Sequence, residues 1–164
     1  MPELPEIEIV KRSLFKMINK AKIINVTINN SNLRYKLNNK FSKDLTGEKI
    51  LNVSRRSKYL ILHLSKKLLI IHLGMSGKLL LLRKKDKALL KTSFYYNLNI
   101  LHKHNHIYFT LDHGVVLIYN DVRRFGFLKL YKTTKIQKIP FIKKLGLEPL
   151  SKIFDIKYFK KFIK

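Results

Sequence analysis

The strongest constraint on the fold is a series of short apolar segments that begins near residue 22 and runs through most of the chain. Apolar residues recur at every second position, which is the period of a strand with one buried face. Many segments end at Gly, Asn or Asp, residues typical of turns. We predict strands near residues 22–28, 49–53, 57–64, 68–73, 78–82, 106–111, 115–120 and 127–131.

Residues 3–20 predict one amphipathic helix ahead of these strands. Its apolar face consists of Ile7, Val10, Leu14 and either Met17 or Ile18, and Pro2 and Pro5 suit its first turn. Two strand connections are short enough for hairpins, at Ser65–Lys67 and at Asp112–Gly114. We therefore predict a mainly β fold with α structure: a two-layer β-sandwich of about eight strands, or a flattened barrel, with the N-terminal helix packed on it.

Two stretches depart from the strand pattern. Residues 83–104 are rich in lysine and irregular, which predicts an exposed loop. Residues 152–163 have apolar side chains at helical spacing, but the chain ends at Lys164 with no cap and with nothing to cover that face. We expect a β-sandwich domain over residues 1–150 and the start of a truncated helical domain over residues 151–164.

The charge balance favours a polyanionic partner. The chain has 35 Lys and Arg residues against 10 Asp and Glu, a formal net charge of +25. A protein this basic is drawn to polyanions, and nucleic acid is the first candidate. Lys, Asn and Ile are all abundant, so the codon bias of an AT-rich genome accounts for part of the excess. Charge alone therefore indicates nucleic acid and nothing more specific.

The chain contains no cysteine. This excludes disulfides, Cys-ligated zinc, iron–sulfur clusters and thiol nucleophiles within these residues. The N-terminus is acidic where a secretory signal would be basic and then apolar. No apolar run approaches the roughly 20 residues that cross a bilayer. We expect a cytoplasmic protein with no membrane partner.

The first eight residues concentrate acidic side chains in a very basic chain: Glu3, Glu6 and Glu8. The helix macrodipole favours acids at a helix start, an explanation that competes with a functional one for Glu8. It does not explain Pro2. Removal of Met1 would leave a secondary amine whose pKa, near ~8, lies far below that of lysine, so more of it is nucleophilic at neutral pH. A neighbouring carboxyl group can exchange protons with whatever that amine attacks.

Several strings in this chain resemble bacterial formamidopyrimidine-DNA glycosylases in order and spacing. They are Met1-Pro-Glu-Leu-Pro-Glu6, Arg55-Arg-Ser-Lys58-Tyr-Leu, His72-Leu-Gly-Met75-Ser-Gly77, Lys103-His104-Asn-His106, Asp121-Val-Arg123-Arg124-Phe125-Gly126 and Leu145-Gly-Leu-Glu-Pro-Leu-Ser151. Together they span nearly the whole chain. The chain is similar also to the endonuclease VIII branch, but its opening and its Met with Arg-Arg-Phe pattern resemble the formamidopyrimidine branch.

The resemblance implies a base-excision-repair enzyme, both DNA glycosylase and abasic-site lyase, that removes oxidised purines such as 8-oxoguanine and formamidopyrimidines from duplex DNA. Pro2 would attack C1′ of the damaged nucleoside, displace the base and form a Schiff base with the opened sugar. Glu3 would be the general acid for ring opening, with Glu6 in support. Lys58, at a predicted strand start, would contact phosphate beside the lesion and assist β-elimination. Without its matching neighbours, Lys58 would be interpreted as a surface lysine.

The resemblance also implies that Met75, Arg123 and Phe125 fill the gap left by a flipped-out lesion. Extrusion of a base costs on the order of a few kcal/mol, and inserted side chains recover part of that cost. Considered singly, Met75 and Phe125 would be interpreted as core residues. Gly74 and Gly77 flank Met75, however, and suit a tight loop better than a core strand.

The resemblance further implies that Arg124 binds phosphate, which matches the guanidinium fork, and that His104 contacts DNA. An alternative is a metal cluster, because His102, His104 and His106 would share one face of a strand and imidazole suits nickel or zinc. No carboxylate lies among these histidines, and we predict no metal site. We expect His63 and His72 to be sheet residues with satisfied hydrogen bonds.

Three features depart from the family pattern. Asn105 stands where the family usually has Asp, which is expected to weaken local hydrogen bonding, and Val122 stands where it has Pro, which is expected to loosen a turn. The family continues into a helix–two-turns–helix module and a four-cysteine finger that holds one zinc ion; this sequence ends inside the first helix of that second domain. We therefore expect no cofactor in this chain, and weak DNA binding with little repair activity if it is the whole product.

The expected partner is damaged double-stranded DNA, bound by a monomer or by this chain with a second polypeptide that supplies the remaining half. Two other functions stay open. The chain could be a basic module that binds DNA or RNA without chemistry, or an inactive gene fragment. Borohydride trapping on abasic-site DNA would detect only the enzyme, while salt-dependent binding without trapping would support the module. Self-association through the apolar face of residues 153–162 would support the fragment.

Overall fold

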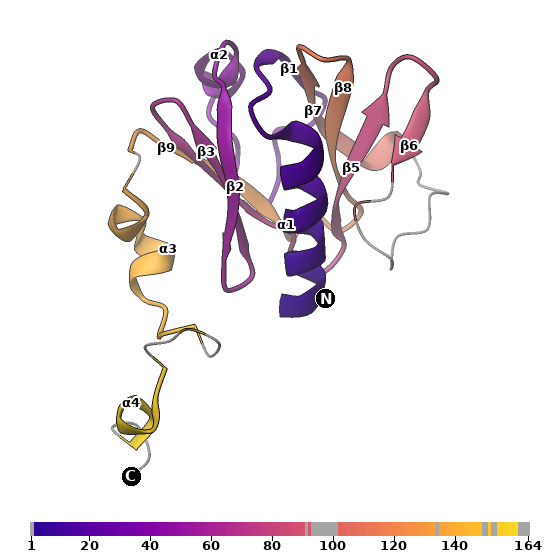
Figure 1. Ribbon diagram of the computed structural model, residues 1–164. Coiled ribbons are helices and arrows are strands. Elements are labelled where there is room, and N and C mark those ends of the chain that lie inside the picture. The colour runs from indigo at the N-terminus through magenta and orange to yellow at the C-terminus, as the bar shows by residue number, and fades with distance from the viewer. Residues whose placement is uncertain are drawn as a thin grey trace. The chain divides into compact units, whose positions relative to one another are not determined.

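The computed structural model describes residues 2–90, 92, 102–133, 135–148, 151 and 154–160. The chain divides into two compact units, Met1–Thr134 and Lys135–Lys164, and each is a separate body. The first unit contains both sheets and the long N-terminal helix (Figure 1). The predicted domain boundary between residues 150 and 151 stays a prediction.

The first unit is built on two antiparallel sheets, which confirms the predicted mainly β fold. The five-stranded sheet has the order β1-β7-β8-β5-β6, and the four-stranded sheet has the order β2-β3-β4-β9. The strands are β1 (Ile23–Ile28), β2 (Ile50–Arg56), β3 (Tyr59–Leu64), β4 (Leu68–His72), β5 (Gly77–Arg83), β6 (Ala88–Leu90), β7 (Asn105–Leu111), β8 (Val115–Asp121) and β9 (Phe127–Tyr131). Buried side chains from both sheets form one apolar core.

All eight predicted strands form, and the two predicted hairpins connect β3 to β4 and β7 to β8. The predicted loop over residues 83–104 is wrong in part. Ala88–Leu90 pair with β5 as β6, and His102–His104 form a short 3-10 helix, η1. Asp86 closes the β5–β6 turn by accepting hydrogen bonds from the Arg83 guanidinium and the Ala88 N–H. Within that predicted loop, residues 91 and 93–101 lie outside the described residues.

The N-terminal helix is α1 (Leu4–Ile18), close to the predicted range. Its buried face consists of Ile7, Val10, Leu14 and Ile18, each at most 1% exposed. Burial of side chains of this size contributes roughly 1.5–3 kcal/mol each, so this face anchors α1 to β2 and β3. Glu3 caps the helix in an extended conformation, and the positive φ of Lys20, 67°, marks the turn that follows its end.

A five-residue helix, α2 (Phe41–Leu45), was not predicted. It buries Phe41 and Leu45 against the core, and the Ser42 hydroxyl donates to the Val26 carbonyl of β1 at 2.6 Å. A helix of this length is too short to show a periodic pattern in the sequence. Its formation therefore depends on the tertiary packing of its two apolar residues.

The second unit contains η2 (Ile136–Lys138), α3 (Pro140–Lys143) and α4 (Ile156–Lys160). The helix predicted over residues 152–163 is present as α4, where the Asp155 carboxylate accepts a hydrogen bond from the Tyr158 N–H at 2.7 Å. Residues 152, 153 and 161–164 of that prediction lie outside the described residues. Among the helices described in either unit, none has the length and apolar character that crossing a membrane requires.

Candidate active site

The N-terminus of α1 and the turn between β2 and β3 bring predicted catalytic residues together. Pro2 is half-buried and directly precedes the cap residue Glu3, whose backbone N–H donates to the Glu6 carboxylate at 2.7 Å. The Lys58 ammonium lies 2.9 Å from the side chain of the same cap residue, at the Glu3 Oε2 atom. Residues 3 and 58 are far apart in the sequence, so this ion pair results from the packing of α1 on the four-stranded sheet.

Lys58 lies one residue before the strand start that was predicted for it, because β3 begins at Tyr59. Ser57 and Lys58 form a two-residue turn, and Arg56 pairs directly with Tyr59. Ser57 has a φ of 50°, a left-handed conformation that favours glycine and is uncommon for serine. A turn this short leaves Lys58 little freedom, and the lysine is 30% exposed beside a Glu3 side chain that is 62% exposed.

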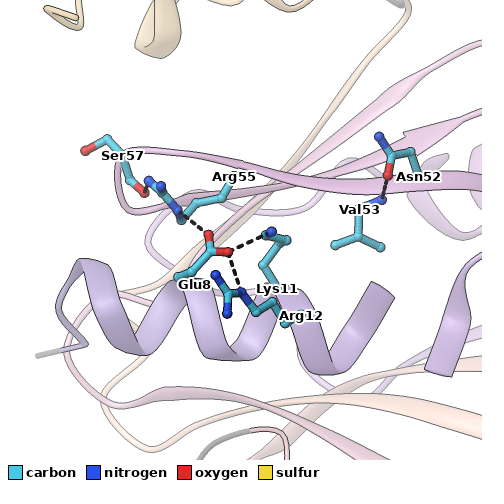
Figure 2. A network of polar contacts seen from close by, with 7 residues as sticks. All are labelled: Glu8, Lys11, Arg12, Asn52, Val53, Arg55 and Ser57. Atoms are coloured by element: carbon cyan, nitrogen blue, oxygen red, sulfur yellow. Dashed lines mark hydrogen bonds and ion pairs between the residues drawn. The ribbon is translucent and has the colours of Figure 1, made fainter. Parts of the chain in front are cut away.

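Glu8 of α1 is the centre of a further network of charges (Figure 2). One oxygen of Glu8 contacts Lys11 at 2.8 Å and Arg12 at 2.9 Å, and the other accepts from Arg55 Nε at 3.0 Å. Partial burial acts to raise the pKa of Glu8, but hydrogen bonds from Lys11, Arg55 and Arg12 outweigh it and lower the pKa to about 2. Glu8 is therefore ionised throughout the neutral range.

The second cluster forms where two loops are held by one buried carboxylate, Asp121. Its Oδ1 accepts from the Ser76 hydroxyl at 2.5 Å, and its Oδ2 accepts from the Tyr119 hydroxyl at 3.0 Å and the Gly126 N–H at 2.9 Å. Burial, followed by the Asp121 charge, raises the pKa of Tyr119, so its hydroxyl stays a donor. Asp121 thus ties the Leu73–Gly77 loop to the loop that follows β8.

Glycines let these two loops approach closely. Gly74 has a φ of 61°, and a Cβ there would lie 2.5 Å from the Gly126 nitrogen and from the Phe125 carbonyl carbon. A Cβ on Gly126 would lie 2.1 Å from the Tyr119 hydroxyl. A Cβ on Gly77 would lie 2.3 Å from the Leu73 carbonyl oxygen, so both glycines that flank Met75 shape a tight loop, as their positions in the sequence indicated.

The side chains on these loops face outward. Met75 is 46% exposed and Phe125 is 45% exposed, so neither is a core residue. The Arg123 guanidinium lies over the Phe125 ring, 4.5 Å from its centroid, and Arg124 has a φ of 55°. Exposed apolar side chains stacked with a cation suit contact with bases of DNA.

A pocket of about 780 Å³ opens between the two loops and the segment that follows β1. Its lining includes Met75, Arg123, Arg124 and Phe125, and also Asn32, Leu33, Arg34, His72 and Gly74. Four of the five predicted DNA-contacting residues thus line one concave surface. His104 does not line this pocket; it lies in η1, before β7.

His72 is a pocket residue that the sequence pattern indicated only as a sheet residue. Its Nδ1 accepts a hydrogen bond from the Gly74 N–H at 3.0 Å, and its ring stacks on Phe127. Burial, then the positive charges of Arg34 and Lys58, lower the pKa of His72. Because His72 pairs with Tyr59 in the sheet, the pocket lies next to the turn that carries Lys58. The apolar pattern of β4, which ends at His72, does not indicate that this histidine lines a pocket.

His63 and the other predicted sheet histidine, His72, both have hydrogen-bond partners, as expected; His63 Nε2 lies 2.6 Å from the Ser54 hydroxyl. The three alternating histidines do not share one strand face, since His102 and His104 lie in η1 and His106 Nε2 bonds the Asp121 carbonyl oxygen at 2.7 Å. Among the described residues, no group of three His, Asp or Glu side chains is arranged to hold a metal ion.

The two small departures from the family pattern have different structural settings. Asn105 is buried, and its Oδ1 accepts a hydrogen bond from the Asn120 amide at 2.7 Å; the expected weakening relative to aspartate stays a prediction. Val122 is 55% exposed in the turn after Asp121. The buried carboxylate of Asp121 holds that turn without proline.

Comparison with known proteins agrees with this geometry. A family model for the formamidopyrimidine-DNA glycosylase N-terminal domain matches residues 1–128. The chain therefore belongs to the formamidopyrimidine-DNA glycosylase family, which it matches through the N-terminal domain. The formamidopyrimidine-DNA glycosylases of Bartonella tribocorum and Bartonella quintana are 44% and 46% identical to it, over 98% and 96% of this chain.

Solved structures show the same similarity. Lactococcus lactis Fpg in complex with DNA containing an abasic site has a TM-score of 0.77 at 35% identity, over 98% of this chain and 55% of that one. The complex of this enzyme with DNA containing FAPY-dG has a TM-score of 0.76, over 97% of this chain. The described fold is thus that of a protein solved on damaged DNA.

The chain spans about half the length of the curated relatives it matches, 55% and 54% of the two Bartonella proteins. The four-cysteine zinc finger that the resemblance implies has no ligands among residues 1–164, which include no cysteine. No step of the chemistry proposed for these residues passes through a metal.

Proposed function

We propose that this chain carries the reacting groups of a base-excision-repair DNA glycosylase and abasic-site lyase that acts on oxidised purines in duplex DNA. The 2.9 Å contact between Lys58 and Glu3 is the observation that carries the proposal. It joins two of the three predicted catalytic residues directly beside the third, Pro2.

The Pro2 amine, free once Met1 is removed, attacks C1′ of the damaged nucleoside. The bond from C1′ to the base breaks, and its electron pair leaves with the base, which takes up a proton. Glu3 then donates a proton to the ring oxygen as the C1′–O4′ bond breaks, leaving a cationic Schiff base, an iminium without an N–H, between C1′ and the proline nitrogen. The proton that the proline nitrogen carries after its attack is lost first, which frees the nitrogen lone pair to expel O4′. The resulting cation is an electron sink.

β-Elimination follows from that intermediate. Loss of a proton from C2′ sends electrons toward the Schiff base and expels the 3′ phosphate, which cuts the strand. The Lys58 ammonium stabilises the departing phosphate charge. Glu6, which accepts the Glu3 N–H, keeps the cap in place. Water then releases the sugar fragment from Pro2.

The pocket between the two loops, next to the catalytic residues, binds the distorted DNA. Met75, Arg123 and Phe125 enter the stack where the lesion leaves it, and Arg124 and His104 bind the backbone. His72 and Arg34 add polar groups to the same concave surface. Such chemistry takes place where chromosomal DNA lies, which in the bacteria that hold the relatives is the cytoplasm. The preferred lesion is left open by these residues.

A second candidate, a basic nucleic-acid-binding module without chemistry, is favoured by the net charge of +25. Attraction to phosphate needs no catalytic residue. The two candidates differ in one observable, since only the enzyme forms a covalent bond to an aldehydic sugar through the Pro2 nitrogen.

The test is borohydride trapping on duplex DNA with a single abasic site, after removal of Met1 has been confirmed by mass. We expect an adduct with the wild-type chain, a weaker one with Pro2→Gly, which keeps a primary amine at the N-terminus, and none with a variant whose N-terminus is blocked by an uncleaved extension. Salt-dependent binding without an adduct would assign the chain to the binding-module class.

A further inference from the structure

Arg55 connects the helix to the turn that carries Lys58. Its Nε donates to Glu8 Oε2 at 3.0 Å, and its Nη1 donates to the Ser57 carbonyl oxygen, also at 3.0 Å (Figure 2). One guanidinium thus uses two of its nitrogens on two different elements. A lysine has a single nitrogen on a flexible stem and cannot replace this fork.

The turn requires such support because its first residue is strained. Ser57 adopts a φ of 50°, which side chains other than glycine, asparagine and aspartate seldom adopt. Its carbonyl oxygen is the atom that Arg55 binds. The next residue is Lys58, so a change in the backbone at Ser57 moves the lysine directly.

The two ion pairs, Arg55–Glu8 and Lys58–Glu3, differ in solvent exposure. Arg55 and Glu8 have side chains 15% and 24% exposed, whereas the Glu3 side chain, paired with Lys58, is 62% exposed. Exposed ion pairs seldom hold two long side chains in one geometry by themselves. The Lys58–Glu3 contact therefore depends on the backbone that places it.

The charges around Glu8 keep this support assembled. Lys11 and Arg12 contact its Oε1 from α1, and Arg55 contacts its Oε2 from β2. With a pKa of about 2, Glu8 stays ionised and holds the Arg55 fork at any neutral pH. The capping role of acidic residues at a helix start does not account for a contact with another element.

We infer that Glu8 and Arg55 are positioning residues, whose ion pair holds the Ser57–Lys58 turn so that the Lys58 ammonium meets the Glu3 carboxylate. This inference rests on the proposed function, because the lysine and the carboxylate matter there for strand cleavage. Neither Glu8 nor Arg55 touches the sugar or the phosphate in the proposed reaction.

The test is Arg55→Lys, which keeps the charge and removes the fork. We expect the single-turnover rate of strand cleavage at an abasic site, at saturating protein, to fall about tenfold, with DNA affinity changed by less than about twofold. Since Arg55 acts through Lys58, Arg55→Lys combined with Lys58→Ala should be no slower than Lys58→Ala alone. Multiplying effects in the double variant would overturn the inference.

The matched control is Arg83→Lys, because Arg83 also forms a fork with a carboxylate, Asp86, in an exposed turn between β5 and β6. We expect no change in cleavage for this control. If Arg55→Lys fails to fold, Glu8→Gln makes the same test with a side chain of nearly equal shape, and the same tenfold loss is expected.

A measurement that does not depend on catalytic activity tests this inference separately from the proposed function. The NMR ¹³C shifts of the Ser57 α and β carbons report its left-handed conformation, and we expect Arg55→Lys to move them toward extended values while Arg83→Lys leaves them unchanged. Absence of any cleavage by the wild-type chain would contradict the proposed function only. Unchanged Ser57 shifts in both Arg55→Lys and Glu8→Gln would overturn the inference about positioning.

Discussion

The loops around Asp121 and the turn that carries Lys58 are held in place by opposite means. Asp121 is fully buried and accepts hydrogen bonds from two hydroxyls and a backbone N–H. Glycines allow the two loops that it joins to approach closely. The Lys58 turn is held by partly exposed charges that pair across α1 and β2. A buried network gives one fixed surface, whereas exposed ion pairs respond to pH, salt and substrate.

This difference matches the two tasks in the proposed function. Side chains that enter the DNA stack need a rigid support, since a displaced wedge would not fill the gap. Groups that exchange protons and bind departing phosphate need access to water and to substrate charge. Four predictions test this contrast, from the largest expected effect on stability to the smallest.

Asp121→Ala should have the largest effect on stability. It would leave the Ser76 and Tyr119 hydroxyls and the Gly126 N–H without their acceptor, at a cost of about 3–5 kcal/mol in the free energy of unfolding. Urea denaturation measures this cost. Asp112→Ala in the exposed β7–β8 turn is the control, and equal losses in the two variants would contradict the account of the buried network.

Gly74→Ala and Gly114→Ala compare two left-handed glycines, with φ of 61° and 81°. Gly114 has open space around it, so alanine there should cost about 1 kcal/mol from the backbone alone. A Cβ at Gly74 would meet backbone atoms at 2.5 Å, so overpacking should raise the cost to about 3 kcal/mol. Equal losses in thermal or urea unfolding would show that the two loops are not packed against each other as described.

Glu8→Gln should lower stability in a pH-dependent way. The pKa of Glu8 is lowered from 4.5 to about 2 by folding, so its ionised form stabilises the fold fully above pH 4.5 and loses that effect as the pH falls toward 2. After allowance for solvent screening, we expect a difference of about 1 kcal/mol between variant and wild type at pH 6. Urea unfolding at pH 6 and pH 2.5 should show this difference shrink; a constant difference would exclude the charge as its cause.

Met75→Ala and Phe125→Ala should change stability least, by less than about 0.5 kcal/mol, because both side chains are about half exposed. Their affinity for abasic-site duplex should nonetheless fall about tenfold, since the gap in the stack would be unfilled. Fluorescence anisotropy measures that affinity, with undamaged duplex as the reference. A large loss of stability with unchanged affinity would make both residues structural.

Most of the fold could be predicted from periodicity. The eight strands and the buried face of α1 follow from apolar residues at spacings of two and of three to four, which show in the sequence directly. β6 and α2 were missed because Ala88–Leu90 and Phe41–Leu45 are too short for any period. Their structure depends on pairing with β5 and on burial against the core.

The site was predictable only in part. Pro2, Glu3 and Lys58 could be selected from the chemistry of the N-terminus and the resemblance, but the network behind them could not. Glu8 looked like a helix-start acid, and Arg55 looked like one of many basic residues. Their pairing depends on the angle at which α1 crosses β2, which no local pattern contains. The position of His72 beside the pocket likewise depends on tertiary packing and could not be predicted from a local pattern.

In the proposed reaction the proline nitrogen, and no lysine, is the nucleophile. With 28 lysines in the chain, a reduced adduct could also form on a lysine near the bound sugar. The most direct measurement is protease digestion of the borohydride-trapped complex, followed by mass spectrometry of the peptide that carries the sugar. We expect the sugar on the N-terminal peptide, attached to the Pro2 nitrogen. A sugar attached to Lys58 or to another lysine, with Pro2 unmodified, would contradict it.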